Sequence, residues 1–208
     1  MTAKRVAGSL VLSIVLLGGR LPSFAFAQRG GMPGMPGMDM GHEIVIPKGA
    51  LYTKADVEFM QGMIAHHAQA IYMSRLAASH GANHKLLKLA TKIDQSQVAE
   101  IRIMQQWLRS NGQTAPDTSS WRTMRMAGML TDDQIKALTD AKGIEFDRAY
   151  LEYMIQHHEG ALQMVKDLFA TPRAGQEVDV NVFANDVVSV QTAEIGAMRQ
   201  MLSQLSDK

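Results

Sequence analysis

Two segments of the chain repeat one arrangement of metal-binding side chains. Residues 63–73 read Met-Ile-Ala-His-His-Ala-Gln-Ala-Ile-Tyr-Met and residues 154–164 read Met-Ile-Gln-His-His-Glu-Gly-Ala-Leu-Gln-Met, which align without a gap at an offset of 91. Imidazole nitrogen and thioether sulfur together suit soft ions such as Cu(I) and Ag(I). We therefore predict a copper site, with zinc less favoured, whose candidate ligands are Met63, His66, His67, Met73, Met154, His157, His158 and Met164.

Helical spacing places one histidine of each pair on an apolar stripe. Separations of 4, 3, 4 and 3 residues put Phe59, Met63, His66, Ala70 and Met73 on one face, and Tyr150, Met154, His157, Ala161 and Met164 on another. An inward imidazole needs a hydrogen-bond partner or a metal ion. We expect His66 and His157 to be the principal ligands and the four methionines to assist them. The adjacent His67 and His158 lie about 100° further round, where they border the interior, bridge to a neighbouring helix or face water.

Polar residues interrupt the apolar stripes of the two partner segments at equivalent positions. They are Gln97 and Glu100 in the first copy and Gln191 and Glu194 in the second. Each carboxylate either accepts the free N–H of a liganding histidine or forms a polar contact that holds two helices together. The sequence favours neither interpretation.

A second concentration of soft ligands precedes these segments, in residues 32–42. Its side chains are Met32, Met35, Met38, Met40 and His42, interspersed with glycine and proline. This stretch has no helical or strand periodicity, so we interpret residues 28–50 as a flexible arm that binds Cu(I) or is a low-complexity tail. A third group, Met124, Met126 and Met129, binds metal or covers the end of the core.

The elements that must position the histidines are predicted to be helices. Thr53 can cap a helix that runs to about residue 80, and further long helices are expected at about 84–110, 144–170 and 180–205. Thr131 and Gln134 form a capping box for a short helix. Residues 97–108 also repeat, at 191–202, so the chain contains two helical hairpins of one design. Residues 51–208 should therefore form an all-α four-helix bundle with approximate two-fold symmetry.

The beginning of the chain has the order of a secretory signal. Lys4 and Arg5 precede an apolar run, and Ala25-Phe26-Ala27 matches the small-x-small pattern of a cleavage site. We predict that residues 1–27 are removed after Ala27 and that the protein is periplasmic or secreted. The apolar run is too short for a stable membrane anchor.

Composition excludes several classes of function. Among 208 residues there is no cysteine, which rules out disulfides, thiolate metal sites and cysteine nucleophiles, whereas methionine occurs 16 times. Without the signal, 18 basic residues stand against 20 acidic ones, so no attraction to nucleic acid is expected.

The histidine segments also resemble a known family, the ferritin-like domain-of-unknown-function family 305. Residues 59–70 and 143–161 carry the resemblance, which spans roughly residues 50–205. It implies a four-helix, ferritin-like fold and, from the few members with an assigned role, periplasmic copper binding and copper resistance. A proline often precedes the first histidine pair in that family, where this chain has Ala65.

The leading interpretation is a binding protein, not an enzyme, that captures or buffers copper and exchanges it with copper transport or efflux proteins. One alternative is a dinuclear metal oxidoreductase of the ferritin type, but no glutamate of the helical segments is followed three residues later by histidine, as such enzymes require. The other alternative is a helical structural or partner-binding module in which the histidines are core residues. The sequence predicts no particular oligomeric state.

Overall fold

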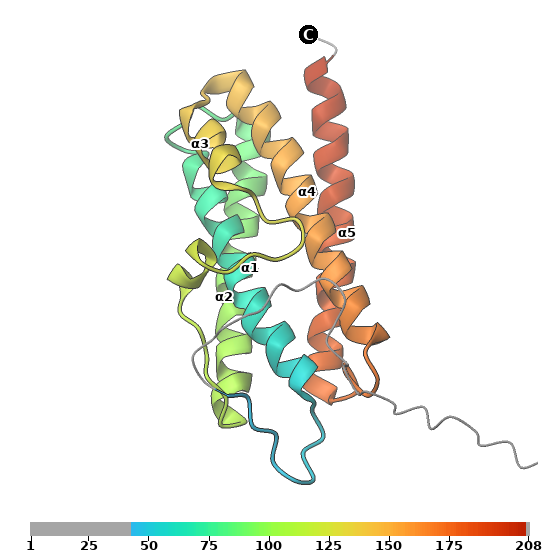
Figure 1. The fold of residues 1–208 in the computed structure, drawn as a ribbon. Coiled ribbons are helices and arrows are strands. Elements are labelled where there is room, and N and C mark those ends of the chain that lie inside the picture. Colours follow the sequence, from blue (N-terminus) through green and yellow to red (C-terminus); the bar gives the residue numbers. More distant parts are fainter. Residues whose placement is uncertain (1–42, 207–208) are drawn as a thin grey trace, which may run out of the picture. The chain divides into compact units, whose positions relative to one another are not determined.

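Five α-helices and one short 3-10 helix, η1, make up the regular structure of residues 43–206, the part of the chain that the computed structural model describes (Figure 1). Their bounds are α1 Lys54–Leu76, α2 His84–Ser110, η1 Thr118–Arg122, α3 Asp132–Asp140, α4 Gly143–Ala170 and α5 Val178–Ser206. No strand occurs within these residues, so the prediction of an all-α fold is confirmed.

Side-chain caps fix where the helices begin. At α1 the Thr53 hydroxyl accepts from the backbone N–H of Asp56, and the Asp56 carboxylate accepts from that of Thr53. Thr131 and Gln134 form the same box at α3, as the sequence predicts. The first helix ends at Leu76, not near residue 80, because the chain turns there and the His80 ring binds the Leu76 carbonyl at 2.8 Å.

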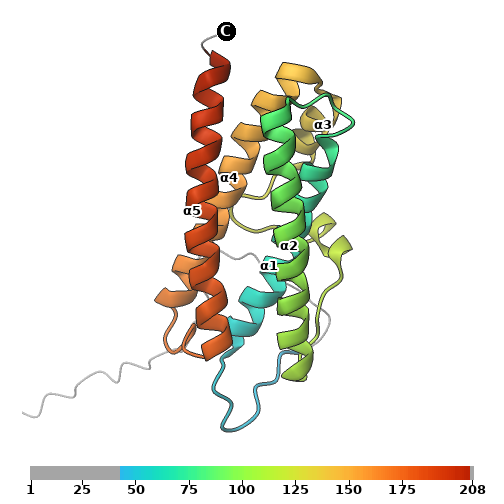
Figure 2. The same cartoon turned by 180° about the vertical axis from the view of Figure 1, so that it is seen from behind.

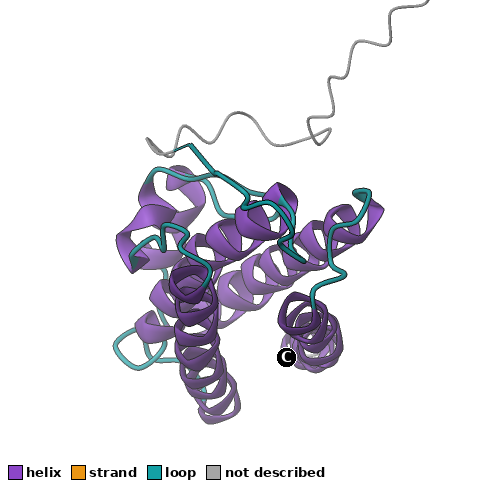
Figure 3. Cartoon of the chain, turned by 90° about the horizontal axis from the view of Figure 1, so that it is seen from below, coloured by secondary structure: helices purple, strands orange, loops and turns teal. Residues whose placement is uncertain are grey.

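The four long helices form two hairpins that meet through α1 and α4. Helix α1 packs along α2, α4 packs along α5, and α1 contacts α4. Figure 2 shows α2 and α5 on the face opposite to the linker, and Figure 3 views the helices end on. A hydrogen bond of 2.9 Å between the hydroxyls of Ser74 and Tyr150 ties α1 to α4. This contact brings the two histidine-bearing helices together.

Helix α1 is buried on almost every side. It is enclosed by α2, by α4 and by the linker between α2 and α3, which crosses in front of α1 and α4 in Figure 1. Eighteen of its 23 residues are consequently buried, and among them are the polar side chains of His66, His67 and Gln69. Such a helix can carry polar groups only if they find partners inside the protein.

The described end of the segment that we expected to be an arm contacts the core. Ile44, Ile46 and Ala50 are partly buried against it, and Tyr52 is buried. The signal peptide, the cleavage site and the arm side chains Met32, Met35, Met38, Met40 and His42 lie outside the described residues. None of the described helices combines the length and apolar character needed to cross a membrane.

Candidate metal centre

His66 of α1 and His157 of α4 face each other in the interior. Both side chains are fully buried, and their ring centroids lie 3.8 Å apart. The two residues occupy equivalent places in the sequence repeat, one in each hairpin. The structure thus joins the two inward stripes at the histidines, as the duplication predicts.

The linker fixes the orientation of the His66 ring. Its Nε2 lies 3.0 Å from the carbonyl oxygen of Ala127. A carbonyl can only accept, so Nε2 carries the proton, and Nδ1 of the neutral ring holds a free lone pair. No protein group bonds to this Nδ1. The ring therefore presents one unused donor atom to the interior.

His67 and His158 are oriented by carboxylates of the partner helices. Nε2 of His67 donates to Glu100 of α2 at 2.6 Å, and Nε2 of His158 donates to Glu194 of α5 at 2.9 Å. Both imidazoles are fully buried, which settles the direction that helical spacing left open. The carboxylates bond to these second histidines of each pair, not to His66 and His157. An ionised carboxylate only accepts, so Nδ1 of each ring is the unprotonated nitrogen.

All four imidazoles have unsatisfied nitrogens. Nδ1 of His66, His67 and His158 has no hydrogen-bond partner, and His157 has none at either ring nitrogen. Buried polar atoms are rarely left unpaired, because each one costs about 1–3 kcal/mol. Five such atoms from two facing motifs favour a ligand that the protein atoms alone do not supply.

The two halves of the centre differ at their outer edge. Lys92 approaches the Glu194 carboxylate at 3.5 Å, and that carboxylate is almost completely buried. The carboxylate of Glu100 is 23% exposed, and Asp186 occupies the position equivalent to Lys92 in the second repeat. The duplication therefore gives two similar but electrostatically unequal His-Glu pairs. Gln97 and Gln191 are three residues before Glu100 and Glu194 in the sequence. Both are buried, and the side-chain oxygen of each has no hydrogen-bond partner.

The predicted methionine ligands lie in the core on both sides of the histidines. Met63 and Met154 are each one helical turn from the facing imidazole of their own helix, and Met73 and Met164 lie two turns away in the other direction. All four are buried. Within residues 43–206, side chains of His, Cys, Asp and Glu form no group of three or more that could hold a metal ion. Among the candidate ligands, the structure brings the imidazoles of His66 and His157 into contact, and the four methionines are buried on the same two helices.

Burial keeps the facing imidazoles neutral. The pKa of His66 is lowered from 6.5 to about 3, mainly by loss of water and next by the neighbouring His67, while the bond to Ala127 opposes the shift. The pKa of His157 also falls well below 6.5, first through burial and then through the nearby histidines. Protons therefore compete weakly for these nitrogens at neutral pH.

The linker closes over the centre through two glycines that the sequence reading missed. A side chain on Gly160 of α4 would overlap the carbonyl of Ala127, and Gly128 has a φ of +76° and lies against α4. Gln69 pairs with the backbone of Leu130 through bonds of 2.7 and 3.1 Å. A glycine inside a helix is the signal that could have pointed to this close approach.

Other candidate ligands lie elsewhere. Met124, Met126 and Met129 are buried in the hydrophobic core, which fits the interpretation of a cover. The His80 ring lies between the carbonyl oxygens of Leu76, at 2.8 Å from Nδ1, and Thr139, at 2.9 Å from Nε2, and it packs on Phe146. His84 is exposed at the start of α2.

The burial of the histidines predicts how acid acts on the metal-free protein. His66 takes up a proton near pH 6.5 in the unfolded chain but only near pH 3 in the folded chain. The contribution of neutral His66 to the free energy of unfolding is therefore fully present above pH 6.5, and it is lost as the pH falls towards 3. Urea unfolding at about pH 7.5 and about pH 5.5, above the usual carboxyl range, should show this loss. His66→Leu with His157→Leu should reduce it, and an unchanged pH dependence in that variant would contradict the assignment.

Comparisons with solved structures give similar chains, one of which has been solved with bound metal ions. A DUF305 protein from Streptomyces coelicolor, described as a candidate secreted protein, matches with 28% identity and a TM-score of 0.64 over 73% of this chain and 94% of that one. A DUF305 fragment from Deinococcus radiodurans matches with 28% identity and a TM-score of 0.64 over 74% and 98%. CopM in its Cu(I)-bound form matches with 28% identity and a TM-score of 0.57 over 72% and 96%. CopM is also solved with Cu(II) and with silver.

No curated protein matches the chain. The family model described as Domain of unknown function (DUF305) matches residues 56–202, which is most of the chain. Both histidine segments lie within this match, and it covers nearly all of the two helical hairpins. The chain therefore belongs to the DUF305 family.

Proposed function

We propose that this protein binds copper, preferentially as Cu(I), between His66 and His157, and that it captures or buffers the ion outside the cytoplasm in copper homeostasis. The observation that carries the proposal is the pair of buried imidazoles, 3.8 Å apart between ring centroids, with unpartnered nitrogens. A bound ion would take up one unpartnered nitrogen of each ring. The role is binding and exchange, with no catalytic step.

The surroundings of the pair favour a soft ion. Met63 and Met154 offer thioether sulfur one turn from each imidazole, and thioether selects Cu(I) and Ag(I) over harder cations. Glu100 and Glu194 fix the orientation of the neighbouring histidines His67 and His158. His67 and His158 are therefore assigned a supporting place beside the pair rather than a share of the ion.

Two comparisons support the proposal. CopM, a similar chain, is solved with Cu(I), Cu(II) and silver, which is the set of ions expected for mixed imidazole and thioether ligation. The Streptomyces coelicolor relative is described as a candidate secreted protein, in keeping with the export signal that we predict for residues 1–27. A competitive titration of the purified protein with Cu(I), Ag(I), Cu(II) and Zn(II) tests the proposal, which predicts tightest binding of the two monovalent ions.

Replacing the flanking methionines should separate the two oxidation states of copper. Met63→Leu with Met154→Leu removes two thioethers but keeps much of their volume, so the packing penalty should stay below about 1.5 kcal/mol. We expect Cu(I) affinity to fall about tenfold, while Cu(II) affinity changes less. Met60→Leu, also buried on α1 but off the histidine stripe, is the matched control. Equal losses for both ions would show that these sulfurs are not ligands.

Removing the methionine-rich segment should change the number of copper ions bound and leave the fold intact. The deletion should cover residues 28–42 and stop before Ile44, which packs against the core. Five soft side chains are lost in this way, so the Cu(I) stoichiometry should fall while the circular dichroism spectrum stays helical. An unaltered stoichiometry would show that the segment does not bind copper.

A further inference from the structure

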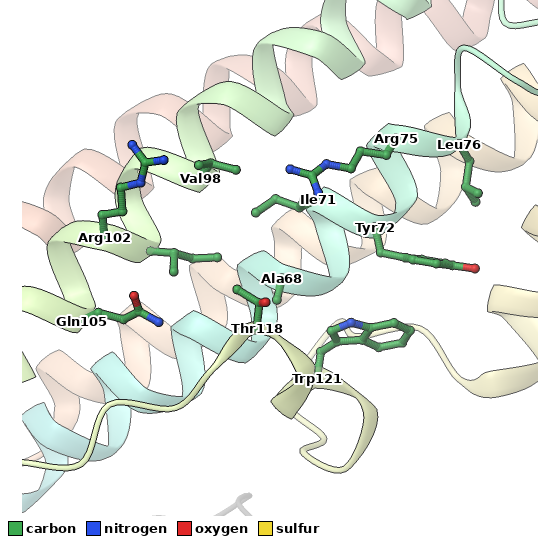
Figure 4. Close-up of a pocket in the computed structure, with 11 residues that line it drawn as sticks. Ala68, Ile71, Tyr72, Arg75, Leu76, Val98, Arg102, Gln105, Thr118 and Trp121 are labelled. Atoms are coloured by element: carbon green, nitrogen blue, oxygen red, sulfur yellow. The ribbon is translucent and has the colours of Figure 1, made fainter.

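A pocket of about 520 Å³ opens between α1, α2 and η1 (Figure 4), and neither His66 nor His157 is among the residues that line it. Its floor is apolar, with Ala68 and Ile71 from α1 and Val98 and Ile101 from α2. This volume lies in the range of sites for small organic ligands. The proposed copper function makes no use of this pocket.

The linker builds one wall of the pocket from aromatic side chains. Trp121 of η1 lies against Tyr72 of α1, with ring centroids 5.1 Å apart and planes inclined at 35°. Figure 4 shows the two rings side by side at the edge of the lining residues. The linker has no counterpart in the second hairpin, so this wall occurs once in the repeat.

The second hairpin carries charged side chains at two positions that are equivalent to pocket-lining residues. The residues equivalent to Ala68 and Gln105 are Glu159 and Arg199, and these form an ion pair of 2.6 Å across α4 and α5. In the first hairpin a methyl group replaces the carboxylate and an amide replaces the guanidinium. The side chains that line this part of the pocket are therefore specific to the first hairpin.

Positive charge flanks the apolar floor. Arg75 and Arg102 stand on the two helices on either side of Val98 (Figure 4). Arg75 is held by Asp94 at 2.9 Å, whereas Arg102 has no ion pair with any carboxylate of residues 43–206. Arg102 corresponds to Gly196 in the second repeat, so the charge is also specific to this hairpin. An unpaired guanidinium beside an apolar pocket favours an anionic group on an apolar body.

We propose that this pocket binds a small aromatic carboxylate. The ring lies on the apolar floor against Tyr72 and Trp121, and the carboxylate accepts from Arg102 at the rim, with Arg75 adding positive potential. This site is independent of the copper centre.

The test is a titration of the metal-free, full-length mature chain with naphthalene-2-carboxylate, followed by calorimetry and by the two indole N–H signals in NMR. We expect a Kd on the order of 0.1–1 mM, typical of a ligand of this size. Trp121 should shift with that Kd. Trp107 serves as an internal control because its indole donates to Glu177 at 3.0 Å away from the pocket. Equal shifts of both indoles, or no binding at about 5 mM, would overturn the proposal.

Variants test the roles of charge and shape separately. Arg102→Gln, at an exposed position, should weaken the carboxylate about tenfold and leave the neutral alcohol analogue unaffected. Ala68→Glu with Gln105→Arg should close the pocket with the ion pair of the second hairpin and abolish binding. Glu159→Ala with Arg199→Gln is the matched control and should leave the Kd unchanged. Unaltered affinity in Arg102→Gln contradicts the proposed carboxylate site.

Discussion

His157→Phe should lower the affinity for Cu(I) by at least about 100-fold, or 2.7 kcal/mol, without weakening the metal-free fold. Neither ring nitrogen of His157 has a hydrogen-bond partner, so phenylalanine removes no bond and relieves two buried unsatisfied atoms. The ring stays aromatic and of similar size, against His66 at 3.8 Å. Competitive Cu(I) titration and urea unfolding of the metal-free protein measure the two quantities.

The double variant His66→Ala with His157→Ala extends the same test. It should lose the tight site as well, although the loss of the bond to Ala127 adds a stability cost. His84→Ala, at an exposed position, is the control and should change neither quantity. Full copper affinity in His157→Phe together with a destabilised fold would make these histidines structural.

Gly160→Ala should destabilise the fold by about 2 kcal/mol or more, although alanine is the better helix former by about 1 kcal/mol. The new methyl group would overlap the main chain of Ala127 and Gly128, which cannot yield as a flexible side chain does. The linker must then move away from α4, and the bond from Gln156 to Gly128 of 3.3 Å would be strained with it. Urea unfolding measures the loss.

Gly196→Ala is the matched control for this prediction. Gly196 is exposed on α5, and an added methyl group there meets no atom within 4 Å. The control should therefore be neutral or stabilising by up to about 1 kcal/mol. If the two variants behave alike, the linker does not press on Gly160.

The internal repeat is the reason that so much of the centre could be predicted from the sequence. Two copies of one motif at equal spacing identify His66 and His157 as equivalent, and helical periodicity places both on inward stripes. The two stripes are also expected to contact each other, because hairpins with short loops bury their apolar faces best against each other. The structure places the imidazoles as this reasoning requires.

Helical periodicity alone does not predict the hydrogen-bond partner of the second histidine in each pair. His67 and His158 lie off the central stripe, and only the positions of α2 and α5 decide that Glu100 and Glu194 reach them. Sequence spacing orders residues around one helix but does not give the rotation of the neighbouring helix. For that reason the sequence does not decide whether Glu100 and Glu194 support the metal ligands or hold two helices together.

The linker could not be predicted because it has no periodicity. Its path is set by Gly128 and Gly160, and by a backbone carbonyl that binds His66. A carbonyl is present at every residue, so the sequence does not distinguish Ala127 from its neighbours. The same linker forms the aromatic wall beside Tyr72, and it therefore contributes to both sites.

The central claim is that one copper ion is held between the two hairpins. Anomalous diffraction at the copper edge, from crystals of the protein loaded with one equivalent of Cu(I), tests it most directly. The account predicts a single strong peak between His66 and His157, within bonding distance of at least one nitrogen of each ring and near the sulfur of Met63 or Met154. An ordered copper ion elsewhere in the chain, with no peak between these two imidazoles, would contradict it.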